Sequence, residues 1–204
     1  MTIPPTAQAS VAKPRCAWCE GDAAMQHYHD HEWGFTVTDD FVLFEKIALE
    51  SFQAGLSWRT ILHKRASFRH AFAGFDFHQI ASFNAADVQR LMADTGIVRH
   101  RGKILACLHN AQRAQEAVAE FGSLWAFLRP YAPITAGLDA TVPSSTAESI
   151  TLAGVLKKRG WKFLGPTTVY ALMQSSGLVN DHAADCHVRA QVQALRRQRM
   201  AAPI

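Results

Sequence analysis

A short stretch rich in glycine and basic residues reads Thr95-Gly96-Ile97-Val98-Arg99-His100-Arg101-Gly102-Lys103. Helical periodicity lies on both sides of it. Upstream, Asn84 is typical of the N-cap of a helix that ends near Gly96. Downstream, apolar residues at helical spacing predict a long helix over 103–121. The chain is therefore expected to contain two helices joined by a tight, positively charged turn.

The chemistry of this turn is compatible with a bound phosphate. Gly96 permits a left-handed turn, and exposed N–H groups at the start of the next helix can bind an anion. The arrangement resembles the helix-hairpin-helix element, which holds DNA through its backbone without reading the base sequence. Without further context, a plain turn with solvated charges is the favoured interpretation. The predicted DNA-binding residues are Gly96, Arg99, Arg101, Gly102 and Lys103.

Helical periodicity recurs along most of the chain, whereas strand signals are scarce. Further helices are predicted over 39–54, 124–129, 147–159, 167–176 and 181–197, with short apolar clusters at 58–63 and 68–72. The main irregular connection is expected at 132–145, which holds prolines and several Ser and Thr residues. These patterns predict an all-α fold, a compact bundle with two helical lobes.

The length of 204 residues fits one domain with a well-buried core. We expect that domain at 14–190, preceded by a flexible tail at 1–13 and followed by a basic C-terminal tail at 191–204. No apolar run approaches the roughly 20 residues that a membrane helix needs, and no signal-peptide pattern opens the chain. No membrane partner and a cytoplasmic location are therefore expected.

Charge and cysteine usage narrow the class of protein. The formal net charge is +4 with ten histidines in addition. This balance favours a polyanionic partner, although alone it is a weak signal. The four cysteines are Cys16, Cys19, Cys107 and Cys186. Without an export signal, they argue for reduced thiols or metal ligands over disulfides.

Cysteines and histidines near the two chain ends could form one metal site, made of Cys16, His29, His182 and Cys186. His182 and Cys186 are spaced at i and i+4, which would place them on one helical face. Two sulfur and two nitrogen donors suit tetrahedral zinc, and four protein ligands leave no position for an activated water. Such a site would be structural and would join the N- and C-terminal segments. On spacing alone, ordinary packing is an equal alternative, and Cys16-x-x-Cys19 is a competing metal-like pair.

Two segments combine aromatic rings with carboxylates, Tyr28-His29-Asp30-His31-Glu32-Trp33-Gly34 and Glu50-Ser51-Phe52-Gln53-Ala54-Gly55-Leu56-Ser57-Trp58. Rings beside a carboxylate suit a flat, electron-poor or cationic heterocycle, because the rings stack on it and the carboxylate accepts its N–H groups. Glu50 lies in a strongly apolar helix, where an unpaired charge is costly, so it is a functional candidate. An ion-paired structural glutamate is the alternative. Trp18, Trp33 and Trp58 could each be core residues.

Together these segments closely resemble the bacterial 3-methyladenine DNA glycosylase I family, and the resemblance covers about 15–186. Several long matches in order are more specific than any one motif. The matching stretches are Arg15-Cys16-Ala17-Trp18, Tyr28-His29-Asp30-His31-Glu32-Trp33-Gly34, Gln53-Ala54-Gly55-Leu56-Ser57-Trp58, Gly96-Ile97-Val98-Arg99-His100-Arg101-Gly102-Lys103-Ile104, Leu156-Lys157-Lys158-Arg159-Gly160-Trp161-Lys162-Phe163 and Gly177-Leu178-Val179-Asn180-Asp181-His182.

The resemblance implies a helix-hairpin-helix DNA glycosylase fold with one structural zinc ion. The implied ligands are Cys16, His29, His182 and Cys186, and Cys19 is not among them. The resemblance also implies that Glu50 is the catalytic, base-reading carboxylate. The implied aromatic residues of the base pocket are Tyr28 and Trp58, which stack on the base, and Trp18 and Trp33, which complete its walls. Met25 departs from the family pattern, since some relatives carry a tyrosine there, so this part of the wall is expected to be looser.

The implied reaction is hydrolysis of the N-glycosidic bond of 3-methyladenine in double-stranded DNA, which leaves an abasic site. Many helix-hairpin-helix glycosylases place an essential aspartate just after the hairpin, but residues 104–112 contain no acidic residue. The weakened bond of the methylated base and Glu50 would then supply more of the rate. No amine nucleophile is singled out, so a monofunctional enzyme is expected, and nothing in the sequence suggests more than a monomer. Leu56 is the expected residue to fill the gap in the duplex.

Three alternatives remain open at this point: a different glycosylase such as a bifunctional lyase, a DNA-binding module that senses lesions without catalysis, and a catalytic zinc hydrolase. Strand breaks without heat or base would favour the lyase, and lesion binding without base release would favour the module. Activity lost in proportion to metal while the fold survives would favour the hydrolase, although the closed set of four protein ligands argues against it. The wide spread of the four cysteines excludes a four-cysteine iron–sulfur cluster.

Overall fold

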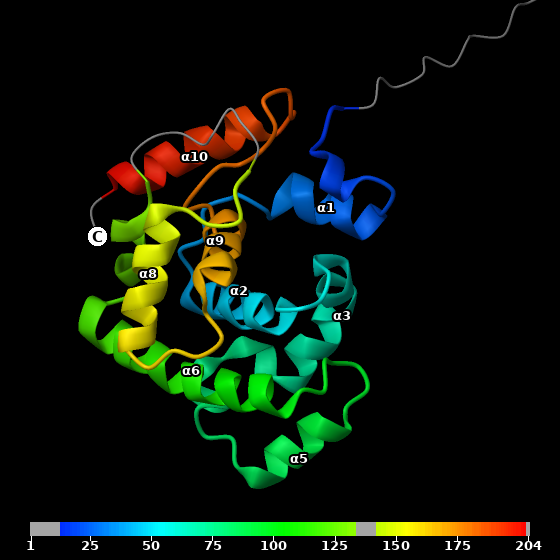
Figure 1. Ribbon diagram of the computed structural model, residues 1–204, viewed down its shortest axis with the longest axis vertical. Coiled ribbons are helices and arrows are strands. Elements are labelled where there is room, and N and C mark those ends of the chain that lie inside the picture. The colour runs from blue at the N-terminus through cyan, green and yellow to red at the C-terminus, as the bar shows by residue number, and fades with distance from the viewer. Residues whose placement is uncertain (1–12, 134–141, 203–204) are drawn as a thin grey trace, which may run out of the picture.

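The computed structural model describes residues 13–133 and 142–202, and every regular element in these ranges is a helix (Figure 1). The all-α prediction is confirmed. The α-helices are α1 (Ala23–His31), α2 (Asp40–Gln53), α3 (Trp58–Ala71), α4 (Phe77–Ile80), α5 (Ala85–Ala93), α6 (Arg101–Phe121), α7 (Leu124–Leu128), α8 (Ala147–Lys158), α9 (Pro166–Ser175) and α10 (Arg189–Ala201). Short 3-10 helices are η1 (Ala17–Cys19), η2 (Ala73–Phe75) and η3 (Arg129–Tyr131). In the described part of the chain, no helix has the length and apolar character needed to cross a membrane.

Helix α2 runs through the centre of the core. The carboxylate of Asp39 caps its start by accepting a hydrogen bond of 2.9 Å from the Val42 N–H. Every residue from 43 to 52 is buried, because α3, α6, α7 and α9 all pack against this helix. The fully buried rings of the core include Phe44, Phe52, Phe68, Phe72, Phe75 and Phe77. Burying one such ring contributes about 1.5–3 kcal/mol relative to exposure.

The predicted helices are found where periodicity is strong. Asn84 caps α5 in a capping box with Asp87. Helix α3 joins the two predicted apolar clusters at 58–63 and 68–72 into one element. Helix α1 was not predicted, although its start is capped by Asp22, whose side chain accepts from the Ala24 and Met25 N–H groups. Its apolar face is short, so periodicity gives a weak signal there.

The predicted helix over 181–197 is wrong at its start. Residues 181–188 form turns, and the helix begins only at Arg189. Side chains replace the helical hydrogen bonds of this segment. Asn180 donates to the Arg189 carbonyl at 3.1 Å and its side-chain oxygen lies 2.9 Å from the His182 ring nitrogen, while the Arg189 guanidinium donates to the His182 carbonyl.

The predicted tail at 191–204 is also different in the structure, because residues up to Ala201 belong to α10. Val192 is fully buried, and the buried Arg196 guanidinium donates to the carbonyls of Leu178 and Pro133 at 3.0 and 2.5 Å. This segment is therefore part of the packed structure. Of the predicted tail at 1–13, all but the last residue lies outside the described residues, as does most of the predicted irregular connection at 132–145.

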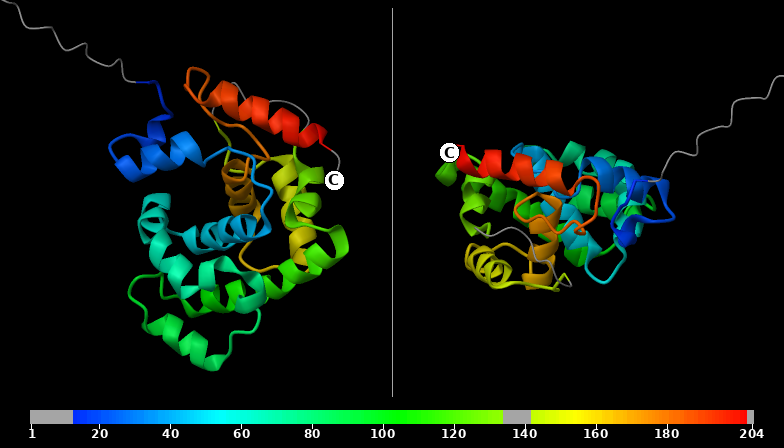
Figure 2. Two further views of the ribbon diagram at one scale, coloured as in Figure 1. Left: turned by 180° about the vertical axis from the view of Figure 1, so that it is seen from behind. Right: turned by 90° about the horizontal axis from the view of Figure 1, so that it is seen from above.

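The N-terminal segment lies beside the loop that precedes α10, and α1 and α10 are at the same end of the molecule (Figures 1 and 2). The His187 N–H donates to the Pro14 carbonyl at 3.0 Å, and the Ala183 N–H to the Cys16 sulfur at 3.3 Å. The segment 14–19 is thus fixed against the loop 181–188.

Gly177 is required where α9 ends. Its φ is +76°, and a β-carbon built on it would lie 2.5 Å from the backbone nitrogen of Thr36 and 2.7 Å from the carbonyl oxygen of Gly34. Both the backbone conformation and the close approach of another chain segment exclude a side chain here. The segment after α1 therefore packs directly on the end of α9.

We predict that Gly177→Ala lowers the free energy of unfolding by about 2–5 kcal/mol, since it combines backbone strain with an overpacked contact. Gly122→Ala is the matched control, because its φ is +84° but nothing lies within 4 Å of the added carbon. Strain alone should cost the control about 1–2 kcal/mol. Chemical denaturation measures both, and equal losses would contradict the packing argument.

Candidate active site

A cavity of about 610 Å³ opens beside α1, the end of α2, α9 and the loop 181–188. All the base-pocket residues predicted from the sequence line it, together with a second carboxylate. These aromatic and acidic lining residues are Trp18, Tyr28, Trp33, Trp58, Glu50 and Asp181. Met25 also lines the cavity, as its place in the predicted wall requires.

The aromatic walls consist of two neighbouring ring pairs. The rings of Tyr28 and Trp58 have centroids 5.1 Å apart, and those of Trp18 and Trp33 are also 5.1 Å apart, edge to face. Tyr28 is only 2% exposed, whereas Trp18 is 38% exposed. The indole N–H of Trp58 is buried and has no hydrogen-bond partner among the described residues. A buried donor of this kind is normally paired, so a ligand acceptor would satisfy it.

Glu50 is the buried acid of this cavity, projecting from the last turns of α2 and only 4% exposed. Burial raises the pKa of its carboxyl group to about 7, and the Ser175 hydroxyl and the Lys46 ammonium act in the opposite direction. No salt bridge joins Glu50 to another described residue. Glu50 is therefore not an ion-paired structural glutamate within the described residues.

Two cations lie near the Tyr28 ring, and one of them is paired with a carboxylate. The Lys46 ammonium is 5.6 Å from the ring centroid, and the Arg65 guanidinium is 6.0 Å from it. Arg65 also donates to both carboxylate oxygens of Glu32, at 2.6 and 2.8 Å. Bidentate pairs of this kind fix geometry as well as charge, so the cations and the Trp58 ring together fix the position of Tyr28.

Sequence reasoning missed Asp181 as a cavity residue. Its carboxylate accepts hydrogen bonds from the Tyr170 hydroxyl at 2.5 Å and from the Gln174 amide at 2.9 Å. The stretch 177–182 contained this residue, but no spacing rule links it to Glu50, which lies on a distant helix. Burial and the Asp181 carboxylate together raise the pKa of Tyr170, so its hydroxyl stays protonated and remains a donor.

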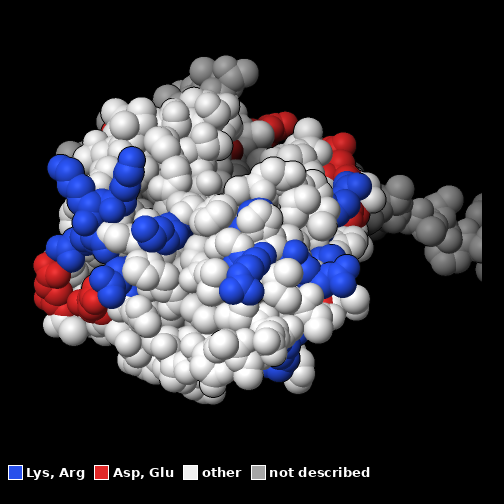
Figure 3. Space-filling model, turned by 60° about the horizontal axis from the view of Figure 1, so that its bottom comes forward, with Lys and Arg blue, Asp and Glu red and all other residues white. Residues whose placement is uncertain are grey.

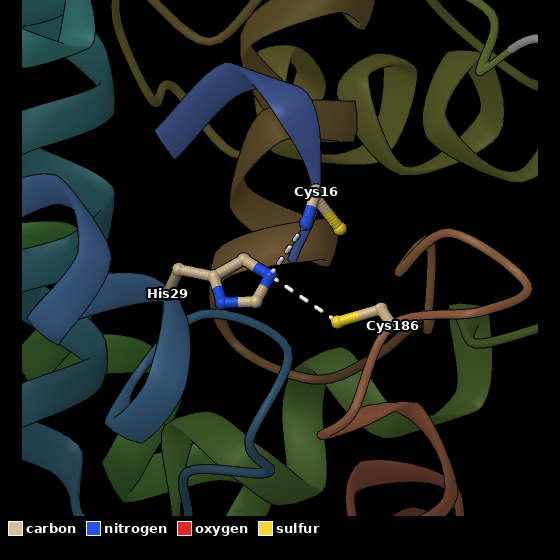
Figure 4. A group of neighbouring side chains, drawn as sticks. All are labelled: Cys16, His29 and Cys186. Atoms are coloured by element: carbon tan, nitrogen blue, oxygen red, sulfur yellow. Dashed lines mark hydrogen bonds between the residues drawn. The ribbon is translucent and has the colours of Figure 1, made fainter. Parts of the chain in front are cut away.

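Three of the predicted metal ligands come together: Cys16, His29 and Cys186 (Figure 4). Their ligand atoms all lie within 4.8 Å of one another, and all three residues are buried. The Nε2 atom of His29 is 3.4 Å from the Cys186 sulfur, while its Nδ1 atom is 2.8 Å from the Asp30 carboxylate. This arrangement orients Nε2 toward the sulfurs, as the outer partners of metal-binding histidines do.

His182 lies beside this cluster but is not one of the three, and the predicted helical i and i+4 relation with Cys186 is wrong. Its ring centroid is 5.0 Å from that of His29. Its Nδ1 atom is 2.9 Å from the Asn180 oxygen, and its Nε2 atom is buried without a hydrogen-bond partner among the described residues. Burial lowers the pKa of His182 to about 3, which leaves a neutral ring with a free lone pair.

Cys19, the competing residue of the sequence analysis, and the neighbouring His187 both have other partners. The Cys19 thiol donates to the Cys16 carbonyl at 3.1 Å and does not join the cluster. The His187 ring contacts the Pro14 carbonyl at 2.9 Å and lies 3.6 Å from Asp30. The cluster therefore contains three of the four predicted ligands, Cys16, His29 and Cys186, and the fourth, His182, lies beside it.

The turn between α5 and α6, residues 94–100, differs in detail from its prediction. Gly96 does not have a positive φ. It is needed for space, because a β-carbon there would lie 2.9 Å from the Ser67 side chain and 2.9 Å from the Asp94 carboxylate. Arg99 and Arg101 are exposed, and His100 caps α6 by accepting from the Lys103 N–H at 3.2 Å.

Lys103 is not available as a DNA contact in this structure, which contradicts its predicted role. It is 6% exposed, and its ammonium donates to the carbonyls of Phe52 and Ala54 at 2.9 and 2.5 Å. These carbonyls belong to the end of α2, where unpaired acceptors and the helix dipole favour a cation. Lys103 thus joins the start of α6 to the loop that carries the 43% exposed Leu56.

Comparison with known proteins gives a consistent result. A family model described as Methyladenine glycosylase matches residues 18–190. The chain is 44% identical over 177 residues to DNA-3-methyladenine glycosylase 1 of Escherichia coli (strain K12), covering 84% of this chain and 95% of that protein.

Solved structures agree. A crystal structure of 3-methyladenine DNA glycosylase I is 46% identical with a TM-score of 0.80, covering 85% of this chain and 98% of that one. A single-residue variant of 3-methyladenine DNA glycosylase I in complex with 3-methyladenine is 34% identical with a TM-score of 0.81, covering 86% and 97%. By sequence and by structure, the chain belongs to the methyladenine glycosylase family.

Proposed function

We propose that this protein is a DNA-3-methyladenine glycosylase of base-excision repair, which hydrolyses the N-glycosidic bond of 3-methyladenine in alkylated DNA and leaves an abasic site. Family membership supports the reaction. The observation that carries it in this chain is the buried Glu50, which has no salt bridge to a described residue, in a cavity lined by four aromatic residues, Trp18, Tyr28, Trp33 and Trp58.

The cavity chemistry suits this base. Methylation at N3 of adenine in DNA places a positive charge on the ring and weakens the bond to the sugar. The damaged nucleotide would be rotated out of the duplex, as bases are for enzymatic attack. Tyr28 and Trp58 would stack on the cationic ring, and Glu50 would accept its N–H groups and attract its charge. Normal adenine lacks that charge and holds its sugar more firmly.

The absence of a nucleophilic amine supports a monofunctional enzyme. A lyase would need an amine at the sugar, and no lysine is among the residues that line the cavity in the described ranges. The Lys103 ammonium is occupied by two backbone carbonyls. Water is then the nucleophile, and the damaged base is the leaving group.

Zinc is the proposed metal of the Cys16, His29 and Cys186 cluster, with His182 as the fourth ligand. The donor set fits, since two sulfurs and two imidazoles form a common structural zinc site. In both histidines Nδ1 is held by an outer partner, Asp30 or Asn180, and Nε2 remains as the donor atom. The unpaired, buried Nε2 of His182 would gain a partner. The ion would staple the first and last segments of the fold and take no part in the chemistry.

The α5–α6 turn is the proposed DNA-binding element, a helix-hairpin-helix. Arg99 and Arg101 are exposed and would neutralise phosphates, and Gly96 and Gly102 would keep the backbone close to the strand. Lys and Arg side chains spread across the middle of one face of the molecule, while most of the acidic side chains in view lie near its edges (Figure 3). This face would hold double-stranded DNA with the cavity beside it.

We predict that Glu50→Gln reduces release of 3-methyladenine from methylated duplex DNA by at least about 100-fold, because the neutral amide cannot attract the cationic base. Chromatography of the released bases measures this. Glu148→Gln on α8 is the control and should release base at the wild-type rate. If folded wild-type protein released no base, the proposed enzyme function would be wrong, and a lesion-binding module would remain.

A second prediction concerns pH and stability. The raised pKa of Glu50 means that the folded state binds its proton more tightly than the unfolded state, so stability decreases as the pH rises through about 7. Removing the charge removes this cost. Glu50→Gln should therefore be more stable than wild type at pH 8, by about 3 kcal/mol, and nearly equal to it below pH 5. Urea denaturation at several pH values tests this, and a pH-independent difference would contradict it.

A third prediction concerns the metal. Cys16→Ser and Cys186→Ser should lose the bound zinc ion, and a chelator should lower the melting temperature of wild type, since metal binding is coupled to folding. Cys19→Ser is the matched control and should keep its zinc. Elemental analysis of purified protein measures the metal content. Full zinc in Cys16→Ser, or its loss in Cys19→Ser, would show that the ligand set is different.

A further inference from the structure

The loop between α8 and α9, residues 159–165, projects two side chains that the proposed function does not use. Lys162 is exposed, and Phe163 is 44% exposed. On either side of them, Trp161 and Leu164 are only 5% and 6% exposed and anchor the loop in the core. A cation and a large aromatic ring are thus presented to solvent from a short, fixed segment.

The backbone of Phe163 is strained. Its φ is +57°, a left-handed conformation that is unfavourable for a bulky residue. Such strain persists only where the surroundings impose it, and it is frequent at functional sites. An exposed ring in this conformation contributes little to the core, so packing alone does not explain why phenylalanine occupies this position.

Helix α6 imposes this conformation. Asn110 is 1% exposed, and its amide binds the backbone of Lys162 from both sides, donating to the carbonyl at 3.0 Å and accepting from the N–H at 2.8 Å. His109 adds a contact of 2.9 Å to the Gly160 carbonyl. Because the buried Asn110 side chain holds the backbone of this exposed loop, the position of Lys162 and Phe163 relative to α6 is fixed.

That position is beside the α5–α6 turn. The rings of His100 and Phe163 have centroids 6.2 Å apart, and the ring atom Cζ of Phe163 would lie 3.6 Å from a β-carbon built on Gly102. The loop therefore continues the surface that presents Arg99 and Arg101. Lys157 and Lys158, at the end of α8, are also exposed.

We propose that Lys162 and Phe163 form a second DNA contact, in which Lys162 neutralises a phosphate and the Phe163 ring packs against a deoxyribose of the same duplex. This inference rests on the proposed function. Positive charge and continuity with the α5–α6 turn favour a polyanionic partner, and an exposed ring beside a cation suits the apolar sugar faces between phosphates. DNA would then be bound by two separate segments, the α5–α6 turn and the α8–α9 loop.

Phe163→Gly tests the ring. Glycine adopts a φ of +57° without strain, so this variant should melt at the wild-type temperature or above it. Its affinity for a duplex that contains a stable abasic-site analogue should nevertheless fall roughly 5-fold or more. Fluorescence anisotropy measures the binding. Binding of free 3-methyladenine should be unchanged, because Phe163 does not line the cavity. A strained residue without a DNA role would instead give a more stable variant with wild-type DNA affinity.

Lys162→Ala tests the charge. The slope of log affinity against log salt concentration should decrease in magnitude by about one, as expected for one lost phosphate contact. Arg197→Ala removes the same charge from an exposed position on α10, at the other end of the molecule in Figure 1, and should leave the slope unchanged. Wild-type affinity in Phe163→Gly together with a wild-type slope in Lys162→Ala would overturn the inference.

These outcomes are separate from the test of the proposed function. If wild-type protein released 3-methyladenine and both variants bound DNA as wild type does, only the second contact would be wrong. If wild type released no base but the variants still lost DNA affinity, the contact would stand and the proposed enzyme activity would fail.

Discussion

The burial of one carboxylate inside the apolar helix α2 is the constraint around which the rest of the molecule is arranged. Glu50 follows a run of core residues, and the helix that carries it packs against four others, α3, α6, α7 and α9. An ionised group in such a place is unfavourable unless a partner compensates it. The described chain supplies no salt bridge, only a nearby ammonium and a hydroxyl. Core packing on the other face of α2 must therefore hold the charge in place, and the large cluster of phenylalanine rings provides that stability.

Both ends of the chain complete the cavity that Glu50 enters. Trp18 and Trp33 come from the first segment, and Asp181 and His182 from the last, so neither end could form the walls alone. The cysteine and histidine cluster lies where these segments meet. The contact that joins the first and last segments therefore also closes the cavity. Helices α2, α3 and α9 supply further cavity residues.

Much of this arrangement could be predicted from the sequence, because some signals are local. Asn84 caps α5 through its own side chain, and the apolar spacing of α2 and α6 reflects faces that are buried in the fold. The cavity residues were found through resemblance to a known family, since no periodicity brings Tyr28, Glu50 and Trp58 together. Residues without a local signal were missed or misplaced. Asp181 enters the cavity through tertiary packing alone.

The wrong predictions have a common physical cause: contacts made in the folded structure determined these positions, not local sequence preferences. A basic residue at the start of a helix is usually solvated, but Lys103 is drawn inward by the free carbonyls at the end of α2. A glycine in a turn usually supplies a positive φ, but Gly96 supplies room for Ser67. The helical spacing of His182 and Cys186 was overridden by the side chain of Asn180, which binds the backbone on both sides of the loop.

Tyr28 and His29 are consecutive residues of the nine-residue helix α1, and they serve different sites. The first forms a wall of the cavity, and the second belongs to the cluster with Cys16 and Cys186. Cys16 and His182 themselves line the cavity. A change that moved α1 outward to admit a bulkier lesion would therefore separate the cluster at the same time. The wall that α1 forms is therefore constrained, and a broader substrate range would have to arise from the cavity residues of α9, Ala171 and Gln174.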